Sequence, residues 1–343
     1  MQWSFKHIAP RFIAIIATIF ASSWIYNKVF WIPELKDQGP MLYNLIEYQN
    51  HNDVLYFGES SNYWVAPEDT DKRTISDMIN DSLFGARLSG IQVPAYHAGM
   101  FLPVITHIHP NARVKHIVVT MNLRSFDKPW IYSTQEGALL RTRCFYYSTP
   151  PLYNRLCATL GFYDNPSPEF QDRKMLKAFE HDQIKANFPL AFTTVNTWKN
   201  SITYLNQDGS TNEDKQGLAH HYVKAYAFSI DTMNNPRIRD FDEIVNVCKL
   251  KNIKVYFNLL SENTQWADSL VGNKLSDLMR YNRDLLVDRY TRKGAVVIDN
   301  LEAVPGKHFG EKNWTTEHYD QTGRAIIAKN VCKALAKVPR KSR

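Results

Sequence analysis

Five short apolar runs alternate with longer stretches that have the spacing of amphipathic helices, and this alternation constrains the fold more than any other feature of the sequence. The runs cover residues 54–57, 90–93, 114–121, 253–260 and 295–298. Helical patterns lie near residues 72–83, 99–108, 240–251, 274–292 and 320–335. Strands that alternate with helices form parallel sheets whose faces are covered by those helices. The sequence therefore predicts an α/β domain with a five-stranded parallel sheet flanked by helices in three layers.

Residues 123–239 interrupt this rhythm after the third strand. The interval is far longer than an ordinary connection between a strand and the next helix, so we expect it to contain structure of its own. Turn-forming residues punctuate it at 150–151, 165–168 and 206–209, and residues 169–187 have a helical pattern. Its many aromatic residues, such as Trp130, fit either a substrate cleft or packing within the insertion.

An apolar run over residues 12–32 precedes the predicted domain. It is about as long as the ~20 residues that cross a bilayer, and its polar interruptions lie near the outer end. Lys6 and Arg11 come before the run, and basic residues favour the cytoplasmic side of a membrane. The sequence thus predicts a single-pass anchor over residues 1–33 with everything that follows outside the cytoplasm.

Two other interpretations of the N-terminal segment stay open. The small residues Ala21, Ser22 and Ser23 are compatible with a cleaved signal peptide, and an amphipathic helix packed on the domain is the other alternative. After the anchor we expect a linker over residues 34–52, a domain over residues 53–338 that includes the insertion, and a basic tail over residues 339–343.

Charge and cysteine content argue against several classes of function. The formal net charge is +7, but the excess is diffuse apart from the C-terminal end, so no nucleic-acid partner is predicted. The four cysteines lack the spacing of a zinc site, and we expect neither a metal nor a cofactor. Cys144 and Cys157 are close enough in sequence to form a disulfide in an oxidising compartment, although two buried free thiols fit equally well.

Three polar residues stand where a parallel sheet presents its functional groups. Ser60 follows the first strand and Asn122 the third, and the carboxyl ends of parallel strands meet at one edge. His318 precedes the last helix, from which it reaches the same edge. A serine with a histidine base and an amide donor can attack an ester and stabilise the oxyanion. The structural alternatives for Ser60 and Asn122 are a turn with a helix cap and a contact that holds a loop.

Together these residues resemble the SGNH (GDSL-type) hydrolase family, whose fold is a flavodoxin-like three-layer sandwich. Four blocks carry the resemblance in order: Gly58-Glu59-Ser60 after the first strand, Gly99 after the second, Thr120-Met121-Asn122-Leu123 after the third, and Thr315-Thr316-Glu317-His318 before the last helix. The resemblance implies Ser60 as the nucleophile and His318 as the base. It also implies Asn122, Gly99 and the Ser60 amide as oxyanion donors.

The sequence departs from the family pattern at the acid. Glu59 and Leu123 replace two acids of the blocks, and Thr315 stands where the carboxylate that orients the histidine is expected. We therefore expect Thr315 to orient the ring through its hydroxyl and Glu317 to be the leading substitute acid. Glu311, a backbone carbonyl, or a Ser-His dyad without an acid are the alternatives.

The anchor and the domain together also resemble membrane-tethered proteins that assist acyl transfer onto envelope polymers, as in teichoic-acid D-alanylation and polysaccharide O-acetylation. This resemblance implies a serine esterase or acyltransferase on the outer side of the bacterial inner membrane. Its substrate would be an acylated envelope glycan or lipid, and its partner a multi-pass membrane acyltransferase. The alternatives are a secreted lipase or thioesterase, and a non-catalytic envelope-assembly protein that binds carbohydrate, which the missing acid at Thr315 favours.

Overall fold

The computed structural model describes residues 5–83, 85–163, 192–311 and 314–336. The helix predicted over residues 169–187 and the basic tail over residues 339–343 lie outside the described residues.

In the described part of the chain, five parallel strands form one sheet in the order β2-β1-β3-β4-β5. Each strand coincides with one of the five apolar runs, which confirms the predicted fold class. Their bounds are β1 (Val54–Gly58), β2 (Leu88–Gln92), β3 (His116–Met121), β4 (Lys254–Leu259) and β5 (Val296–Asp299).

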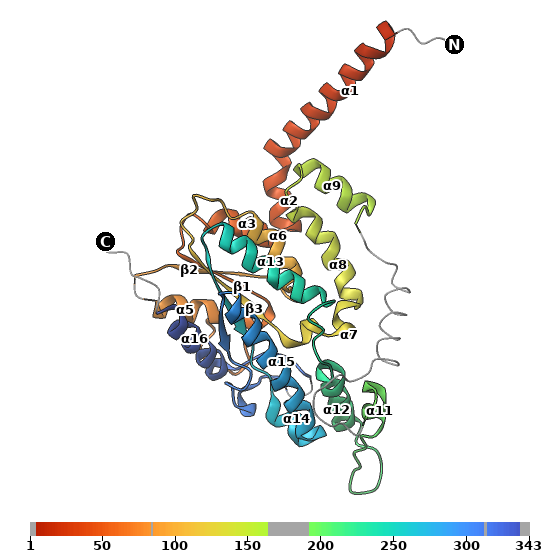
Figure 1. Cartoon of the computed structure of the whole chain (residues 1–343), viewed down its shortest axis with the longest axis vertical. Coiled ribbons are helices and arrows are strands. Elements are labelled where there is room, and N and C mark those ends of the chain that lie inside the picture. Colours follow the sequence, from red (N-terminus) through yellow and green to blue (C-terminus); the bar gives the residue numbers. More distant parts are fainter. Residues whose placement is uncertain (1–4, 84, 164–191, 312–313, 337–343) are drawn as a thin grey trace.

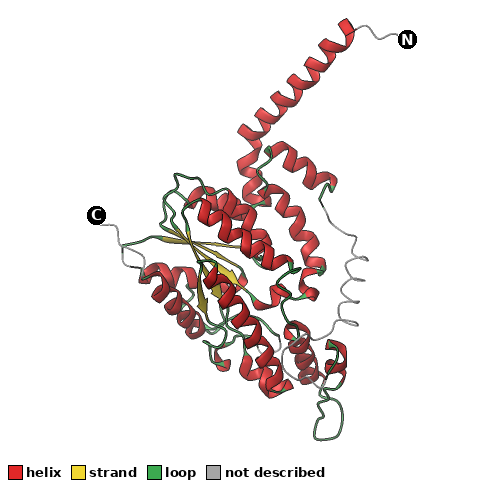
Figure 2. Cartoon of the chain, in the orientation of Figure 1, coloured by secondary structure: helices red, strands yellow, loops and turns green. Residues whose placement is uncertain are grey.

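Helices cover both faces of the sheet, as Figures 1 and 2 show. Successive side chains of a strand point to opposite faces, so Leu55 and Phe57 of β1 pack into one core cluster and Val54 and Tyr56 into the other. Because both faces are buried, the strand is apolar along its whole length. The first face carries α6 (Ala98–Thr106), α13 (Pro236–Leu250) and α15 (Asn273–Arg292), and the second carries α5 (Ile75–Ser82) and α16 (Gln321–Leu335).

The strand order creates a switch point between β1 and β3. The chain leaves β1 towards β2 on one side and continues from β3 towards β4 on the other, so the loops after β1 and β3 diverge and leave a crevice at their carboxyl ends. The short helix α4 (Ser60–Tyr63) follows β1 there, and Asn122 follows β3. The fold therefore gathers the predicted site residues at one edge.

The described parts of the insertion are helical, in agreement with the prediction that it holds structure of its own. Cys144 and Cys157, which fall in this region, are both buried free thiols. The elements are η2 (Leu123–Phe126), α7 (Lys128–Ile131), α8 (Thr134–Arg143), η3 (Cys144–Tyr146), α9 (Pro151–Leu160), α11 (Val195–Asn200) and α12 (Glu213–Tyr226). The helix α14 (Thr264–Val271) and the short turn η4 (Gly306–His308) complete the domain.

A long helical segment projects from the domain at the N-terminus (Figure 1). It consists of α1 (Phe5–Ile25), a π-helical turn η1 (Tyr26–Phe30) and α2 (Trp31–Gln38). Within Ala9–Gln38 an 18-residue window has a mean hydropathy of 1.4, and no part of that window is buried in the domain. The segment is therefore long and apolar enough to cross a membrane.

The linker predicted over residues 34–52 is absent, because the structure makes this segment part of the domain. Its main element is α3 (Pro40–Tyr48), which places Met41, Leu42 and Leu45 in the first core cluster. These residues recur with helical spacing on one face, and Pro40 suits the first turn of a helix. The projecting N-terminal segment thus joins the domain through the packed helix α3.

This correction predicts that α3 stabilises the domain. Leu45 is fully buried, so Leu45→Ala should lower the free energy of unfolding by about 2–5 kcal/mol. Its neighbour Ile46 is 37% exposed, and Ile46→Ala should cost less than about 1 kcal/mol. Urea unfolding of the detergent-solubilised chain, followed by tryptophan fluorescence, measures both. Small and equal losses of unfolding free energy in both variants would support the linker interpretation instead.

Candidate active site

Ser60 is held in place by the turn that follows β1. It is the first residue of α4, and two positions later the buried side chain of Asn62 anchors the turn. Asn62 Nδ2 donates to Ser76 Oγ at 3.0 Å and to Gln92 Oε1 at 2.9 Å, while its Oδ1 accepts from the Ser76 amide at 2.8 Å. The serine is therefore tied to both α5 and β2.

His318 lies between Ser60 and a carboxylate. Its Nε2 is 3.0 Å from Ser60 Oγ, and its Nδ1 is 2.9 Å from Glu311 Oε2. The hydroxyl of Thr316 also donates to Glu311 Oε2. Nucleophile, imidazole and acid thus stand in the linear order of a serine-hydrolase triad, with the acid able to hold the ring in the tautomer that accepts the serine proton.

The acid at His318 is Glu311 and not Glu317, which corrects the leading expectation from sequence. The loop folds back on itself: Phe309 and Tyr319 form an antiparallel bridge, and the Gly310 amide donates to the His318 carbonyl at 2.8 Å. This bridge brings the segment that follows Gly310 beside residues 317 and 318, and the Glu311 carboxylate contacts the imidazole there. The Glu317 carboxylate is directed towards Arg124 instead.

Glu317 has a different partner in the structure. It is buried and accepts two hydrogen bonds from Arg124, at 2.7 Å from Nε and 2.5 Å from Nη2. Thr315, the expected orienting hydroxyl, is buried and lines a pocket next to Glu262. The hydroxyl that meets the triad is that of Thr316. The sequence placed the right residue types in this loop but could not assign their directions.

An indole ring covers the imidazole. The rings of Trp64 and His318 are nearly parallel, with an interplanar angle of 9° and centroids 5.2 Å apart. A Cβ atom at Gly310 would lie 2.0 Å from the Trp64 ring, so only glycine leaves room for this arrangement. Trp64 follows α4 directly, and it therefore links the nucleophile segment to the base.

Burial sets the protonation state of the base. Removal of His318 from water lowers its pKa below the usual histidine value, although the nearby charges of Glu311 and Glu317 oppose this change. The imidazole is consequently neutral at neutral pH and can accept the proton of Ser60.

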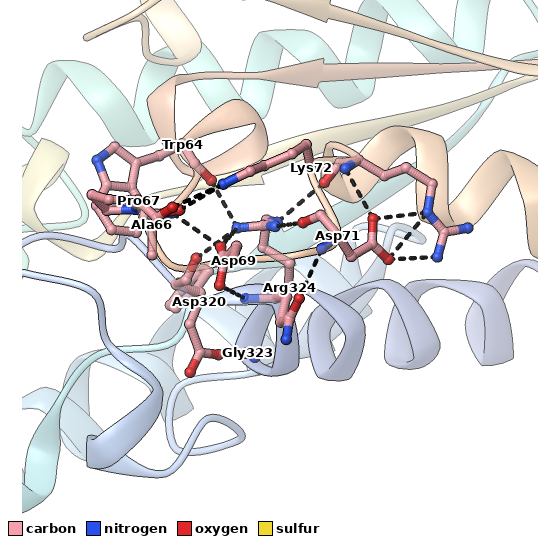
Figure 3. A network of polar contacts seen from close by, with 12 residues as sticks. Trp64, Ala66, Pro67, Asp69, Asp71, Lys72, Asp320, Gly323 and Arg324 are labelled. Carbon is pink, nitrogen blue, oxygen red and sulfur yellow. Dashed lines mark hydrogen bonds and ion pairs between the residues drawn. The ribbon is translucent and has the colours of Figure 1, made fainter.

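Arg324 fastens the two catalytic segments together (Figure 3). Its side chain is fully buried, and its Nη1 donates to Asp69 Oδ2 at 2.7 Å and to the carbonyls of Trp64 and Tyr319 at 3.1 Å. Trp64 ends the nucleophile segment, and Tyr319 is the neighbour of His318. The remaining donors reach the carbonyls of Arg73, at 3.1 Å, and Asp71, at 2.5 Å. The guanidinium therefore fixes the distance between nucleophile and base.

Three glutamates are buried behind the triad in different charge states. Burial and the charge of Glu317 raise the pKa of Glu59 to about 7 and that of Glu262 well above its usual range. Burial alone would raise the pKa of Glu317 too, but Arg124 lowers it. Tyr226 donates to Glu262 Oε2 at 2.5 Å. Glu317 is thus the one of these three glutamates whose pKa is lowered, and Arg124 balances its charge.

Arg124, Glu262 and Tyr226 were not expected from the sequence. Arg124 follows β3 and Glu262 follows β4, so both stand at the carboxyl edge that Ser60 occupies. Their position after a strand was the available signal. Tyr226 comes from α12 of the insertion and carried no comparable signal.

Gly99 does not act as the expected oxyanion donor in this arrangement. Its amide donates to His97 Nδ1 at 3.1 Å, within the first turn of α6. A Cβ atom at this position would lie 2.8 Å from Asp240 Oδ2, so the glycine serves the close packing of α6 on α13. The physical reason for its presence is helix packing.

Asn122 remains a candidate donor together with the Ser60 amide. Its Oδ1 accepts from the Arg124 amide at 2.9 Å, and its NH2 group donates to the Glu59 carboxyl beside it. Asn122 lines a pocket with Glu59, and Trp130 of the insertion lines the same pocket. The other residues that line it are Tyr96, His97, Arg124 and Ser125. At least one insertion aromatic therefore belongs to the candidate cleft.

No family model and no curated protein matches the sequence. Solved structures similar to this chain include a GDSL-family lipolytic protein from Veillonella parvula, with 8% identity, a TM-score of 0.38, and coverage of 83% of this chain and 98% of that one. A lipase/acylhydrolase from Enterococcus faecalis has 8% identity, a TM-score of 0.38, and coverage of 84% and 98%. A variant of an acetyl-xylooligosaccharide esterase from Geobacillus has 7% identity, a TM-score of 0.38, and coverage of 86% and 98%.

By their descriptions these neighbours are ester hydrolases. The Veillonella protein is described as a member of the GDSL family, which is the family that the sequence resembles. The identities and TM-scores are low, so the function of the site has to be argued from its own geometry.

The two glutamates of the loop should respond differently to substitution. Glu311→Gln should lower kcat on an acetyl ester by roughly 10²–10⁴-fold, because the amide no longer stabilises the imidazolium, with little change in folding. Glu317→Gln should instead cost about 3–5 kcal/mol of stability, since it leaves Arg124 buried without its charge partner. Steady-state rates and urea unfolding of both variants test this contrast. A reversed pattern would return the triad acid to Glu317.

The pH dependence of the rate should report the lowered pKa of His318. Because the base must be neutral, kcat/KM should rise with pH to a plateau, with a midpoint below the ordinary histidine value of about 6.5. Glu311→Gln removes a charge that raises this pKa, so the midpoint should move to lower pH. Glu59 has a pKa of about 7, so Glu59→Gln is the control. The rise of kcat/KM with pH should persist in this variant. If the rise of kcat/KM with pH disappeared in Glu59→Gln, the titration would belong to the Glu59 carboxyl.

Proposed function

We propose that the protein is a serine esterase or acyltransferase of the SGNH type, with Ser60 as nucleophile, His318 as base and Glu311 as the acid that orients the base. The hydrogen-bonded series from Ser60 Oγ to His318 Nε2 at 3.0 Å, and from Nδ1 to Glu311 at 2.9 Å, carries this proposal. Its position at the switch point of the sheet adds support, because ligands bind there in open α/β folds.

The proposed chemistry is acyl transfer in two steps. Ser60 Oγ attacks the ester carbonyl while His318 takes its proton, and the tetrahedral intermediate collapses as His318 returns that proton to the departing alcohol. The acyl-serine then accepts water or a sugar hydroxyl, whose proton passes to His318. The acyl group leaves on the new oxygen, and Ser60 regains its proton. The Ser60 amide and Asn122 are the proposed oxyanion donors.

A catalytic role is favoured over a decayed carbohydrate-binding cleft. The departure at Thr315 was the sequence feature that supported a non-catalytic protein. Glu311 supplies the carboxylate that Thr315 lacks, and Thr316 donates to it. The site therefore has a complete set of groups for nucleophilic catalysis.

We further propose that the domain lies outside the inner membrane and acts on an acylated envelope glycan, with a multi-pass acyltransferase as partner. The helix α12 contributes Tyr222 and Tyr226 to a pocket beside the triad, and Asn263, which precedes α14, lines the same pocket. The helices α12 and α14 lie at the end of the molecule opposite the projecting α1 (Figure 1). A site directed away from the anchor favours a polymer over a lipid within the bilayer. Protease added to spheroplasts should digest the domain, and complete protection by an intact inner membrane would contradict this topology.

Covalent labelling tests the nucleophile. Ser60→Ala should abolish labelling by a serine-directed fluorophosphonate while the fold is kept, because the attacking oxygen is removed. Ser61→Ala is the matched control: Ser61 is buried, its Oγ has no hydrogen-bond partner among the described residues, and labelling should persist. In-gel fluorescence and mass spectrometry of the labelled peptide provide the readout. Loss of labelling in Ser61→Ala alone would move the nucleophile to that residue.

The second step decides between hydrolysis and transfer. When an oligosaccharide acceptor is present, the acyl-enzyme formed from an acetyl ester should transfer its acetyl group to that acceptor. Detection of the acetylated oligosaccharide would show this transfer. Release of acetate alone, unaffected by any acceptor sugar, would favour a plain esterase.

A further inference from the structure

The helix α9 exposes an apolar face that the proposed catalytic function does not use. Tyr153, Leu156 and Leu160 are 56%, 47% and 58% exposed, and their spacing places them on one side of the helix. Phe162, 69% exposed, follows the left-handed turn at Gly161 that ends α9. The opposite side is already occupied, because Asn154, Cys157 and Ala158 are buried against the domain. Exposed apolar surface of this kind marks a contact with another phase or molecule.

The position of α9 is fixed relative to the projecting N-terminal helix. The helix α9 contacts both η1 and the end of α1. Arg155 of α9 forms an ion pair with Glu34 at 2.9 Å, and Glu34 also accepts a hydrogen bond from the Tyr26 hydroxyl. The base of the projecting helix and α9 are therefore joined by packing and by a charged contact (Figure 1).

This contact sets the depth at which α9 meets a bilayer. The apolar run over residues 12–32 spans roughly 30 Å at about 1.5 Å per helical residue, which equals the thickness of the hydrocarbon core. Tyr26–Phe30, which α9 touches, forms the outer end of that run. Val29 and Phe30 are themselves 57% and 54% exposed. A bilayer that covers Val29 and Phe30 therefore extends as far as α9.

We propose that the apolar face of α9, formed by Tyr153, Leu156, Leu160 and Phe162, is a second membrane contact that lies in the outer interfacial layer of the same bilayer. Helices of this kind bury their apolar side about 5–10 Å into the boundary between headgroups and acyl chains, where tyrosine is also favoured. Lys28 in η1 supplies a positive charge at the same level for anionic headgroups. The inference rests on the membrane anchoring proposed above.

Two membrane contacts together determine how the domain is oriented, which a single anchor does not. A single membrane-spanning helix does not by itself set the orientation of the domain relative to the bilayer, whereas α9 lying on the surface fixes it. The pocket near α12 and α14 then stays on the side that faces away from the bilayer (Figure 1).

Site-specific photocrosslinking of the full chain tests the occupant of this face. The chain is reconstituted in nanodiscs of phosphatidylethanolamine and phosphatidylglycerol, with p-benzoylphenylalanine at one position at a time. Leu160 and Leu156 probe α9, and Phe20, 72% exposed in α1, reports membrane insertion of the anchor. Met233 and Leu250, 81% and 83% exposed on other parts of the domain, are the matched controls. Far-UV circular dichroism of each variant confirms that it is folded.

Lipid adducts at Leu160 within about threefold of the yield at Phe20, with at least tenfold less at Met233 and Leu250, would support the proposal. Adducts at Phe20 without any at Leu160 and Leu156 would overturn it while leaving the anchor intact. Equal yields at α9 and the control positions would overturn it as well. Absence of adducts at Phe20 would reject the anchor and the second contact together. In whole cells, an adduct at Leu160 to a protein or to another part of this chain would assign the face to that occupant instead.

Discussion

The buried guanidinium of Arg324 is the interaction on which the catalytic arrangement depends. A charge removed from water is costly unless it is fully paired, and Arg324 meets that requirement only when Asp69 and four backbone carbonyls converge on it. Two of those carbonyls belong to Trp64, which directly follows α4, and to Tyr319, which directly follows His318. The fold therefore cannot separate Ser60 from His318 without leaving a buried charge unsatisfied.

Electrostatics at the edge of the sheet gives similar carboxyl groups different roles. Glu311 is partly exposed and reaches His318, where in the proposed reaction its charge supports the imidazolium. Glu317 is buried but stays ionised because Arg124 neutralises it. Burial raises the pKa of Glu59 and Glu262, so neither adds a full negative charge near the oxyanion. A site that stabilises a developing negative charge benefits from this arrangement.

The projecting N-terminal segment and the helix α9 of the insertion lie together at the end of the molecule opposite α12 and α14 (Figure 1). The helix α3 packs in the core, and α9 is paired with Glu34 beside the projecting helix. The N-terminal helical segment is thus joined to the domain by packing and by an ion pair. If α9 rests on the bilayer as proposed, the membrane sets the direction in which the active site faces, and the substrate must approach from the outer side.

The sequence by itself determined the sheet, its flanking helices and the residues Ser60, Asn122 and His318, because apolar periodicity and position after a strand are local properties that survive in any context. Only the tertiary structure decided that Glu311 meets His318, since that contact depends on how residues 309–319 fold back. It also decided that Gly99 serves helix packing and that residues 34–52 belong to the core. Such assignments follow from the directions of side chains and from contacts between distant segments, and neither is encoded in spacing along the chain.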